Sequence, residues 1–393
     1  MDRFKARAPD FWLYVPIIIL AGIGVVMVYS ASSIVAADRY GDAAYFLKRQ
    51  LIWVALGGAA MLLTQRIHYA AFRRFTPFIL LCAIAALGLV LHPGIGRVAG
   101  GARRWLAFGG PFSFQPAEAA KLAMALYLAN FLANRGSELQ DFRRGIVPPL
   151  LITGLIFGLI LAQPDLGSAM LIGLVLIVML FVSGARIAHL AGMFIVGMPG
   201  LVLAILGEEY RRRRLLAFLD PWKDPQGAGF HIIQSLLALG SGGIFGVGLG
   251  NSRQKFFYLP ERHTDFIFSI LGEELGLLGT AAVIVLFALF AYRGFRIARR
   301  APDQFGSLLA SGITTMIVIQ AVLNIGVTTG VLPITGVPLP FLSFGGSSLL
   351  FTMIASGMLL NISQYARGPA EDEAAQPRAD QPAKRPPAGA RAT

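Results

Sequence analysis

Long apolar segments recur along most of the chain, and they constrain the fold more than any other feature. An α-helix needs about 20 mostly apolar residues to cross the roughly 30 Å hydrocarbon core of a bilayer. Hydrophobic residues make up 55% of the 393 residues and charged residues only 14%, whereas soluble domains carry about 25% charged residues. The sequence therefore predicts an all-α integral membrane protein in which the helices form one bundle.

Ten transmembrane helices are predicted. Their expected ranges are 11–35, 46–64, 72–91, 117–133, 146–161, 166–183, 187–206, 266–292, 305–330 and 347–362. Only residues 162–165 separate the fifth from the sixth, so nine spans, with these two merged into one kinked helix, are the main alternative. We expect a membrane domain over residues 1–366 with a large outer loop, 208–265, between spans seven and eight. The tail, 367–393, has no large apolar residue and is expected to be disordered and cytoplasmic.

The charge distribution predicts the orientation. Lys and Arg collect in the short loops on one side of the spans, as in cytoplasmic loops, so both termini are expected in the cytoplasm. The formal net charge of +13 then suits a membrane protein near anionic lipid, and we expect no nucleic-acid partner. The lone Cys82 provides no disulfide framework and no cysteine metal site.

Asp265 is the strongest candidate for a functional residue. It lies where the large outer loop meets the eighth span, in the predicted first turn of that helix. A carboxylate at the edge of an apolar bundle is costly unless it is used. The structural alternative is helix capping by Thr264 or Asp265, and one residue can do both.

Other polar residues lie in or beside the predicted outer segments. Glu118 and Lys121 share one helix face and form a candidate buried pair, while Asp165 begins a helix and suits either capping or function. The candidates to contact an anionic group such as a diphosphate are basic, although they could instead extend to lipid head groups; they are Arg211, Arg212, Arg213, Arg214, Lys223, Arg253, Lys255, Arg262 and His263. Trp105 could be an interfacial belt residue, and Ser343 a helix cap or part of a polar wall.

The glycine-rich stretch 240–250 looks superficially like a dinucleotide-binding loop. It follows no predicted strand, so that signal is weak. Close backbone approach in an interfacial segment is the better interpretation. The preceding residues, 230–239, are predicted to form an amphipathic helix at the membrane interface.

Four ordered strings give the chain a resemblance to a known family. They are Asp220-Pro221-Trp222, residues 254–261, residues 263–266 with Glu273-Glu274-Leu275-Gly276, and residues 338–348. With these strings the chain resembles the SEDS (shape, elongation, division and sporulation) family over about residues 11–362. Within that family it is more similar to the division and sporulation branch (FtsW, SpoVE) than to the elongation branch (RodA).

The resemblance implies a peptidoglycan glycosyltransferase that polymerises lipid II at the outer face of the bacterial cytoplasmic membrane, for septal cell-wall synthesis in cell division. It implies Asp265 as the catalytic aspartate, and contacts to lipid II or the undecaprenyl-diphosphate-linked glycan from Trp105, Glu118, Lys121, Asp165 and Ser343. Its expected partners are a class B penicillin-binding protein, which supplies the transpeptidase, and other membrane proteins of the division complex. A single displacement should invert the anomeric centre.

Several alternatives stay open. The chain could flip lipid II, act as an elongation-type polymerase, or only position partner synthases. No cofactor is certain; a divalent cation could assist the diphosphate, but no acidic cluster has convincing ligand spacing.

Overall fold

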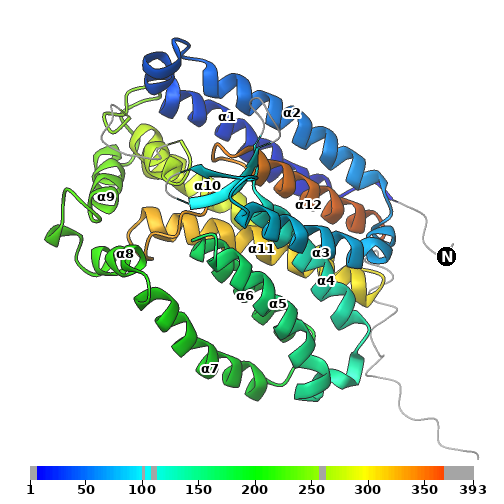
Figure 1. Cartoon of the computed structure of the whole chain (residues 1–393). Helices are drawn as coiled ribbons and strands as arrows, with labels where there is room; N and C mark the ends of the chain where they lie inside the picture. Colours follow the sequence, from blue (N-terminus) through cyan, green and yellow to red (C-terminus); the bar gives the residue numbers. More distant parts are fainter. Residues whose placement is uncertain (1–6, 100–101, 108–112, 256–262, 367–393) are drawn as a thin grey trace, which may run out of the picture.

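Helices dominate the structure. The computed structural model describes residues 7–99, 102–107, 113–255 and 263–366; the predicted tail lies outside them. Each of the ten predicted spans coincides with a helix: α1 (Phe11–Tyr40), α2 (Tyr45–Arg66), α3 (Tyr69–Leu91), α4 (Pro116–Ala133), α5 (Val147–Leu161), α6 (Leu166–Val182), α7 (Ile187–Leu206), α10 (Ile267–Arg300), α11 (Gln304–Thr328) and α12 (Gly346–Gln364) (Figure 1). The predicted large loop contains α8 (Glu209–Leu219), a 3₁₀ turn (Pro221–Lys223) and the predicted amphipathic helix, α9 (Phe230–Gly242).

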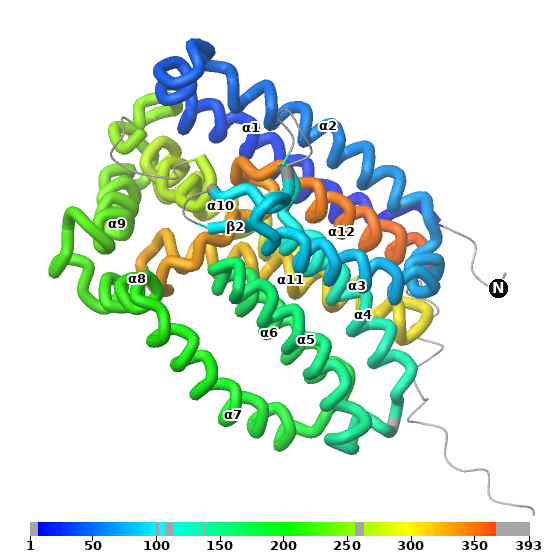
Figure 2. The backbone as a smooth tube through the Cα atoms, viewed as in Figure 1, coloured from blue at the N-terminus to red at the C-terminus, as the bar shows by residue number. Residues whose placement is uncertain are grey.

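Eight helical segments of the described chain are long and apolar enough to cross a membrane, which confirms the helical membrane class. α6 has only 17 residues and α4 carries Glu118 and Lys121, so the total of ten spans remains a prediction. α5 follows a 3₁₀ turn (Gly136–Gln140) and a π-helical turn (Phe142–Ile146). α5 and α6 pack side by side (Figure 2), so the chain turns back at residues 162–165 and the merged, kinked helix is not observed.

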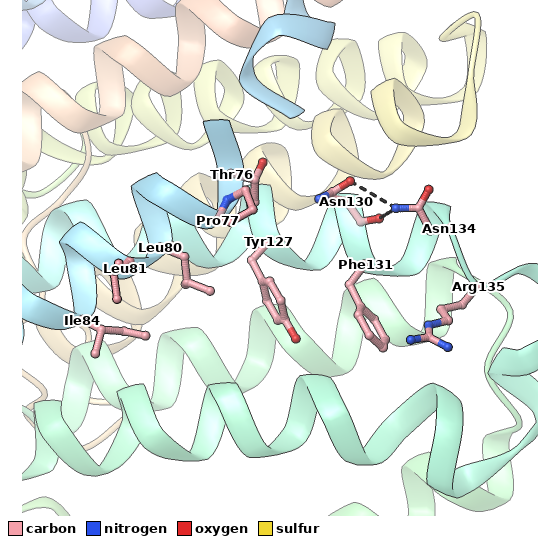
Figure 3. Close-up of a pocket in the computed structure, with 10 residues that line it drawn as sticks. All are labelled: Thr76, Pro77, Leu80, Leu81, Ile84, Tyr127, Asn130, Phe131, Asn134 and Arg135. Carbon is pink, nitrogen blue, oxygen red and sulfur yellow. Dashed lines mark hydrogen bonds between the residues drawn. The ribbon is translucent and has the colours of Figure 1, made fainter. Parts of the chain in front are cut away.

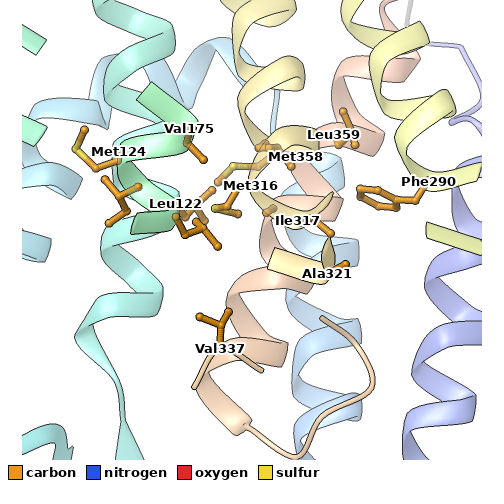
Figure 4. Packing of buried hydrophobic residues seen from close by; sticks show 14 of the residues in the cluster. Leu122, Met124, Val175, Phe290, Met316, Ile317, Ala321, Val337, Met358 and Leu359 are labelled. Carbon is orange, nitrogen blue, oxygen red and sulfur yellow. The ribbon is translucent and has the colours of Figure 1, made fainter. Parts of the chain in front are cut away.

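α11 lies at the centre of the bundle and packs against α4, α6, α10 and α12. Figure 4 shows its buried side chains meeting those of the neighbouring helices; they include Leu122 and Met124 of α4, Val175 of α6, Phe290 of α10, Met316 and Ile317 of α11, and Met358 of α12. The unbranched methionines can fill irregular gaps between helices. α7, in contrast, has no buried residue and lies at the edge of the bundle (Figure 1), as expected for a helix that faces lipid.

The loops separate into two groups. At one end the amide of Arg7 donates to the Gln364 carbonyl at 2.9 Å, and the amide of Tyr69 donates to Asn361 Oδ1 at 2.8 Å; we call this the terminal end. At the opposite end, the loop end, hydrogen bonds join described residues of the connecting segments: Arg104 to Gln163, Gln115 to Ser347, Tyr210 to Pro164 and His263 to Phe344. The segments predicted to share the outer face therefore do lie together.

A small sheet at the loop end is the one departure from an all-α architecture within the described residues. β1 (Gly96–Ala99), β2 (Ala102–Ala107) and β3 (Ser113–Phe114) form an antiparallel sheet in that order. Arg97 pairs with Trp105 in its register. Because the segment is too short and too polar for a helix that spans the membrane, the backbone satisfies its hydrogen bonds locally.

The glycine-rich stretch docks onto a break in α10. Gly276 has φ +67° and interrupts the helix, and the amides of Val247 and Gly248 donate to the carbonyls of Glu273 and Glu274, both at 3.0 Å. A Cβ on Gly246 would lie 2.1 Å from the Glu274 carbonyl oxygen. The predicted close backbone approach is therefore confirmed, and glycine is required by contact as well as by φ.

Candidate active site

Asp265 lies in a turn immediately outside α10. The N-cap residue is Phe266 and makes no side-chain capping bond, so the prediction that Asp265 occupies the first helical turn is wrong. The physical reason is that the Asp265 carbonyl accepts a hydrogen bond from Asn324 Nδ2 at 2.8 Å instead of from a helical amide. The position of Asp265 is thus fixed by α11 as well as by α10.

Three consecutive carbonyls hold this turn in place. The Thr264 carbonyl accepts from Ser343 Oγ at 2.6 Å, and the His263 carbonyl accepts from the Phe344 amide at 2.9 Å. Together with the bond from Asn324 to Asp265, these contacts tie residues 263–265 to the segment before α12. Ser343 therefore positions the backbone beside Asp265, which agrees with neither a simple helix cap nor a polar wall.

A second acid, Asp165, lies at the start of α6 and is 2% exposed. Its carboxylate accepts from the Ser168 amide at 3.1 Å and from Ser168 Oγ at 2.9 Å, which confirms the predicted capping role. Gln115 Nε2 donates to it at 3.3 Å. The α6 N-terminus is adjacent to the Asp265 region, because a Cβ on Gly167 would touch Thr335 and Val337 and one on Gly336 would lie 3.6 Å from Asp265 Oδ2.

Arg214 of α8 is a half-buried cation near this region. Burial lowers the pKa of its guanidinium, and the charge of Arg104 adds to that decrease. The charges of Asp265 and Asp165 act in the opposite direction, so Arg214 is within electrostatic reach of both carboxylates. Its guanidinium also lies 5.6 Å from the Tyr210 ring centroid.

Arg104 and Tyr210 fix the turn between α5 and α6. Arg104 Nε donates to the Gln163 carbonyl at 3.0 Å, and the Tyr210 hydroxyl donates to the Pro164 carbonyl at 3.0 Å. Pro164 itself has φ +28°. The turn between α5 and α6 therefore meets β2 and α8 at one place, next to Asp165 at the start of α6.

The predicted Glu118–Lys121 pair exists and is buried. Lys121 Nζ lies 2.8 Å from Glu118, and the two side chains are 2% and 3% exposed. Lys121 also donates to Gln320 Oε1 at 2.7 Å, and Gln320 Nε2 donates to the Pro338 carbonyl at 2.9 Å. The pair thus supports the 335–344 segment, which in turn holds the Asp265 turn.

The remaining basic candidates differ in their surroundings. Lys255 is 5% exposed, donates to the Gly250 carbonyl and lies 3.7 Å from Glu274, so it holds the glycine-rich segment against α10. The Arg253 amide donates to Glu273 at 2.8 Å while its side chain is exposed. His263 packs 4.6 Å from the Phe46 ring.

Trp105 is half-buried in β2. Arg262 lies outside the described residues. The structure therefore brings Asp265, Asp165, Ser343 and His263 into one region through direct or shared contacts, whereas Lys255 and the Arg253 amide contact the glycine-rich segment and the start of α10.

Sequence reasoning missed the polar residues of α11. Gln320 and Asn324 are 3% and 1% exposed and contact the Lys121 and Asp265 regions. They are one helical turn apart in an apolar span, which is a signal that could have identified them. The four consecutive arginines were candidates, but the sequence does not show which of them turn inward: Arg211 is buried and Arg214 is half-buried, whereas Arg212 and Arg213 are exposed.

Two further observations, both made on the described residues only, concern a metal site and the position of a cavity. They contain no group of three or more His, Cys, Asp or Glu arranged to hold a metal ion. A cavity of about 380 Å³ lies between α3 and α4, lined by Leu80, Tyr127, Phe131 and Arg135 among others (Figure 3). None of its lining residues belongs to the cluster around Asp265.

Fold and site together define a polytopic helical membrane protein with an acidic and basic site at one end of the bundle. The family model described as "Cell cycle protein" (FtsW, RodA and SpoVE) matches residues 11–368. The chain therefore belongs to the FtsW/RodA/SpoVE family.

Relatives and solved structures agree with this family. Stage V sporulation protein E of Bacillus subtilis is 48% identical over 92% of this chain and 99% of its own length. A probable peptidoglycan glycosyltransferase FtsW of Geobacter metallireducens is 46% identical over 93% and 99%.

A chain of the structure titled "Structural coordination of polymerization and crosslinking by a peptidoglycan synthase complex" is similar with a TM-score of 0.75 and 33% identity, over 91% of this chain and 98% of that chain. The rod shape determining protein RodA of Thermus thermophilus gives 0.67 and 30%, over 91% and 97%. The higher identities to SpoVE and FtsW agree with the branch that the sequence strings favour.

Proposed function

We propose that the chain is a peptidoglycan glycosyltransferase that polymerises lipid II into glycan strands. Family membership and relatives named peptidoglycan glycosyltransferase at 45–46% identity support this activity. The observation that carries the proposal is the half-buried Asp265, held by its own carbonyl and those of two neighbours, within electrostatic reach of Arg214.

Asp265 acts as the general base. It removes the proton from the acceptor sugar 4-hydroxyl as that oxygen attacks the anomeric carbon of the growing chain. The new C–O bond forms as the bond to the diphosphate oxygen breaks, and undecaprenyl diphosphate leaves with the electron pair. One displacement inverts the anomeric centre. Because its backbone is held rigidly in this way, the base is preorganised for proton transfer.

Arg214 and Arg104 supply positive charge to the leaving diphosphate. Guanidinium groups match phosphate oxygens well, and partial burial strengthens the interaction by excluding water. Asp165, which accepts hydrogen bonds from Ser168 and Gln115, caps the N-terminus of α6, where Gly167 lies against Thr335 and Val337. Lys121 and Ser343 act through the backbone beside Asp265, so we assign them positioning roles.

The loop end faces outward, both termini are cytoplasmic, and the reaction takes place at the outer face of the cytoplasmic membrane. Lys and Arg asymmetry among the short loops supports this orientation. The similarity to FtsW and SpoVE supports a role in division or sporulation, and the similarity to a chain of a peptidoglycan synthase complex supports a class B penicillin-binding protein as the partner.

The test is polymer formation from lipid II by the purified chain with that partner. We expect glycan polymer from the native protein and at least tenfold less from Arg214→Gln. Arg212→Gln is the matched control, because Arg212 is an exposed neighbour on the same helix. If the protein moves lipid II between the leaflets of a vesicle membrane but forms no polymer, it is a flippase instead. If it shows neither activity, the remaining function is a scaffold that positions partner synthases.

A further inference from the structure

A basic cavity lies at the terminal end, far along the bundle from Asp265. Its volume is about 290 Å³, and it forms where the start of α1 meets the last turns of α10 and the end of α12. Its lining includes Arg7, Asp10, Trp12, Arg296, Arg300 and Ser363. No residue of the proposed reaction takes part in it.

Positive charge dominates this cavity. Arg293, Arg296 and Arg300 line it from one face of α10, and Arg7 and Asp10 line it from the segment before α1. Arg293 Nε donates to Asp10 Oδ2 at 3.1 Å, which neutralises one pair. Within the described chain, no acidic group pairs with Arg296. The guanidinium of Arg296 therefore favours a ligand with negative charge.

The carboxylate of Asp10 also offers a hydrogen-bond acceptor to such a ligand. Asp10 Oδ1 is buried and has no hydrogen-bond partner. Buried acceptors are nearly always satisfied in folded proteins. A ligand that carries a hydroxyl group near its phosphate would donate to this oxygen while the arginines hold the phosphate.

The cavity lies at the depth of lipid head groups. From Leu277 to Arg300, α10 extends roughly 36 Å at 1.5 Å per residue, which exceeds the hydrocarbon thickness of roughly 30 Å. Phe11 and Trp12 line the same cavity and are 69% and 57% exposed. Exposed aromatic rings at a helix end mark the membrane interface, so acyl chains could lie along α1 beside a head group in the cavity.

We propose that this cavity is a binding site for an anionic phospholipid of the leaflet at the terminal end, with a glycerol-type head group. The phosphate contacts Arg296 and Arg300, the head-group hydroxyl donates to Asp10 Oδ1, and an acyl chain packs beside Phe11 and Trp12. A bound lipid of this kind joins the ends of α1, α10 and α12, and so stabilises the terminal end of the bundle.

The test compares phosphatidylglycerol with phosphatidylcholine on the full-length purified protein, by native mass spectrometry of bound lipid and by thermal unfolding. Each arginine near an anionic lipid contributes enough that Arg296→Gln should weaken phosphatidylglycerol binding about fivefold. The double change with Arg300→Gln should weaken it further. Arg299→Gln is the matched control, since Arg299 is exposed on the same turn and does not line the cavity.

Three results would overturn the proposal. The first is equal binding of the two lipids by the native protein, and the second is an equal loss in Arg299→Gln and Arg296→Gln. The third is full replacement of the lipid effect by millimolar inorganic phosphate, which would show a site for a free anion. Thermal unfolding measured in phosphatidylcholine shows whether a variant is misfolded or has only lost lipid binding. Arg296→Lys keeps the positive charge and should retain at least half of the preference for phosphatidylglycerol.

The acidic residues Glu371, Asp372 and Glu373 follow Ala366, a lining residue, within a few positions. If they occupied the cavity in place of lipid, their replacement by Gln, Asn and Gln would strengthen phosphatidylglycerol binding by fivefold or more. We expect unchanged binding in that variant, and a large increase would contradict the lipid assignment.

Discussion

Breaking the buried Glu118–Lys121 pair tests how the bundle supports the site. Lys121→Met leaves Glu118 with no cation in a location where the side chains are 2–3% exposed. Removal of one partner of a buried pair typically costs about 3–5 kcal/mol, whereas replacement of both by apolar residues is often close to neutral. We therefore expect Glu118→Leu and Lys121→Met to be strongly destabilised as single variants. The double variant should lose no more free energy of unfolding than either single variant.

The measurement is a double-mutant cycle, with thermal unfolding and polymerisation from lipid II measured for all four proteins. Arg135 and Glu138 provide a matched control, because they form an ion pair at the same helical spacing but are 38% and 44% exposed. Arg135→Gln should cost about 1 kcal/mol or less.

Polymerisation should fall with stability in the single variants, because Lys121 holds Gln320 and Gln320 holds the Pro338 carbonyl. Additive losses, in which the double variant loses the sum of the two singles, would refute the reasoning. In that case Glu118 and Lys121 would work independently, and Lys121 could contact substrate directly.

Three further predictions follow from individual residues. Gly246→Ala should lower the unfolding temperature and polymerisation, since its Cβ would lie 2.1 Å from a carbonyl oxygen at the α10 break, whereas Gly240→Ala, which meets open space, should not; equal effects would contradict the docking. Burial lowers the pKa of His68, and its Nδ1 accepts from the Ala70 amide, so its stabilising effect should be complete above pH 6.5 and decrease as the pH falls towards its folded-state pKa. His68→Asn should remove that part of the pH dependence of thermal unfolding. With the native cysteine replaced, single cysteines at the exposed positions Glu138 and Gln226 should be labelled from opposite sides of intact cells, and labelling from one side would overturn the orientation.

Hydrophobic periodicity and length were sufficient to predict the ten apolar helices and α9, but not the arginine-rich α8. Each apolar segment satisfies its backbone hydrogen bonds internally, so its position depends on local sequence alone. The small β-sheet could not be predicted in this way, because its pairing depends on Arg97 of β1 meeting Trp105 of β2. The break at Gly276 also depends on partners distant in sequence, namely the amides of Val247 and Gly248.

The site was predictable where one residue type carries the signal. A carboxylate beside an apolar span identified Asp265, and helical spacing identified Glu118 with Lys121. The contacts of Asn324 and the inward direction of Arg214 depend on tertiary packing. The pairing of Lys255 with Glu274 beside the helix break depends on tertiary packing in the same way.

The most direct test of the account is the rate of polymerisation by Asp265→Asn. This change keeps the size of the side chain and removes the basic oxygen, while the backbone bonds from Asn324 and Ser343 remain. Loss of a general base typically lowers the rate about 10²–10⁴-fold, so we expect that loss with an unchanged unfolding temperature. Asp42→Asn, which changes an exposed acid at the same end, should polymerise at the native rate. A folded Asp265→Asn protein that polymerises lipid II at a near-native rate would contradict the assignment of Asp265 as the base.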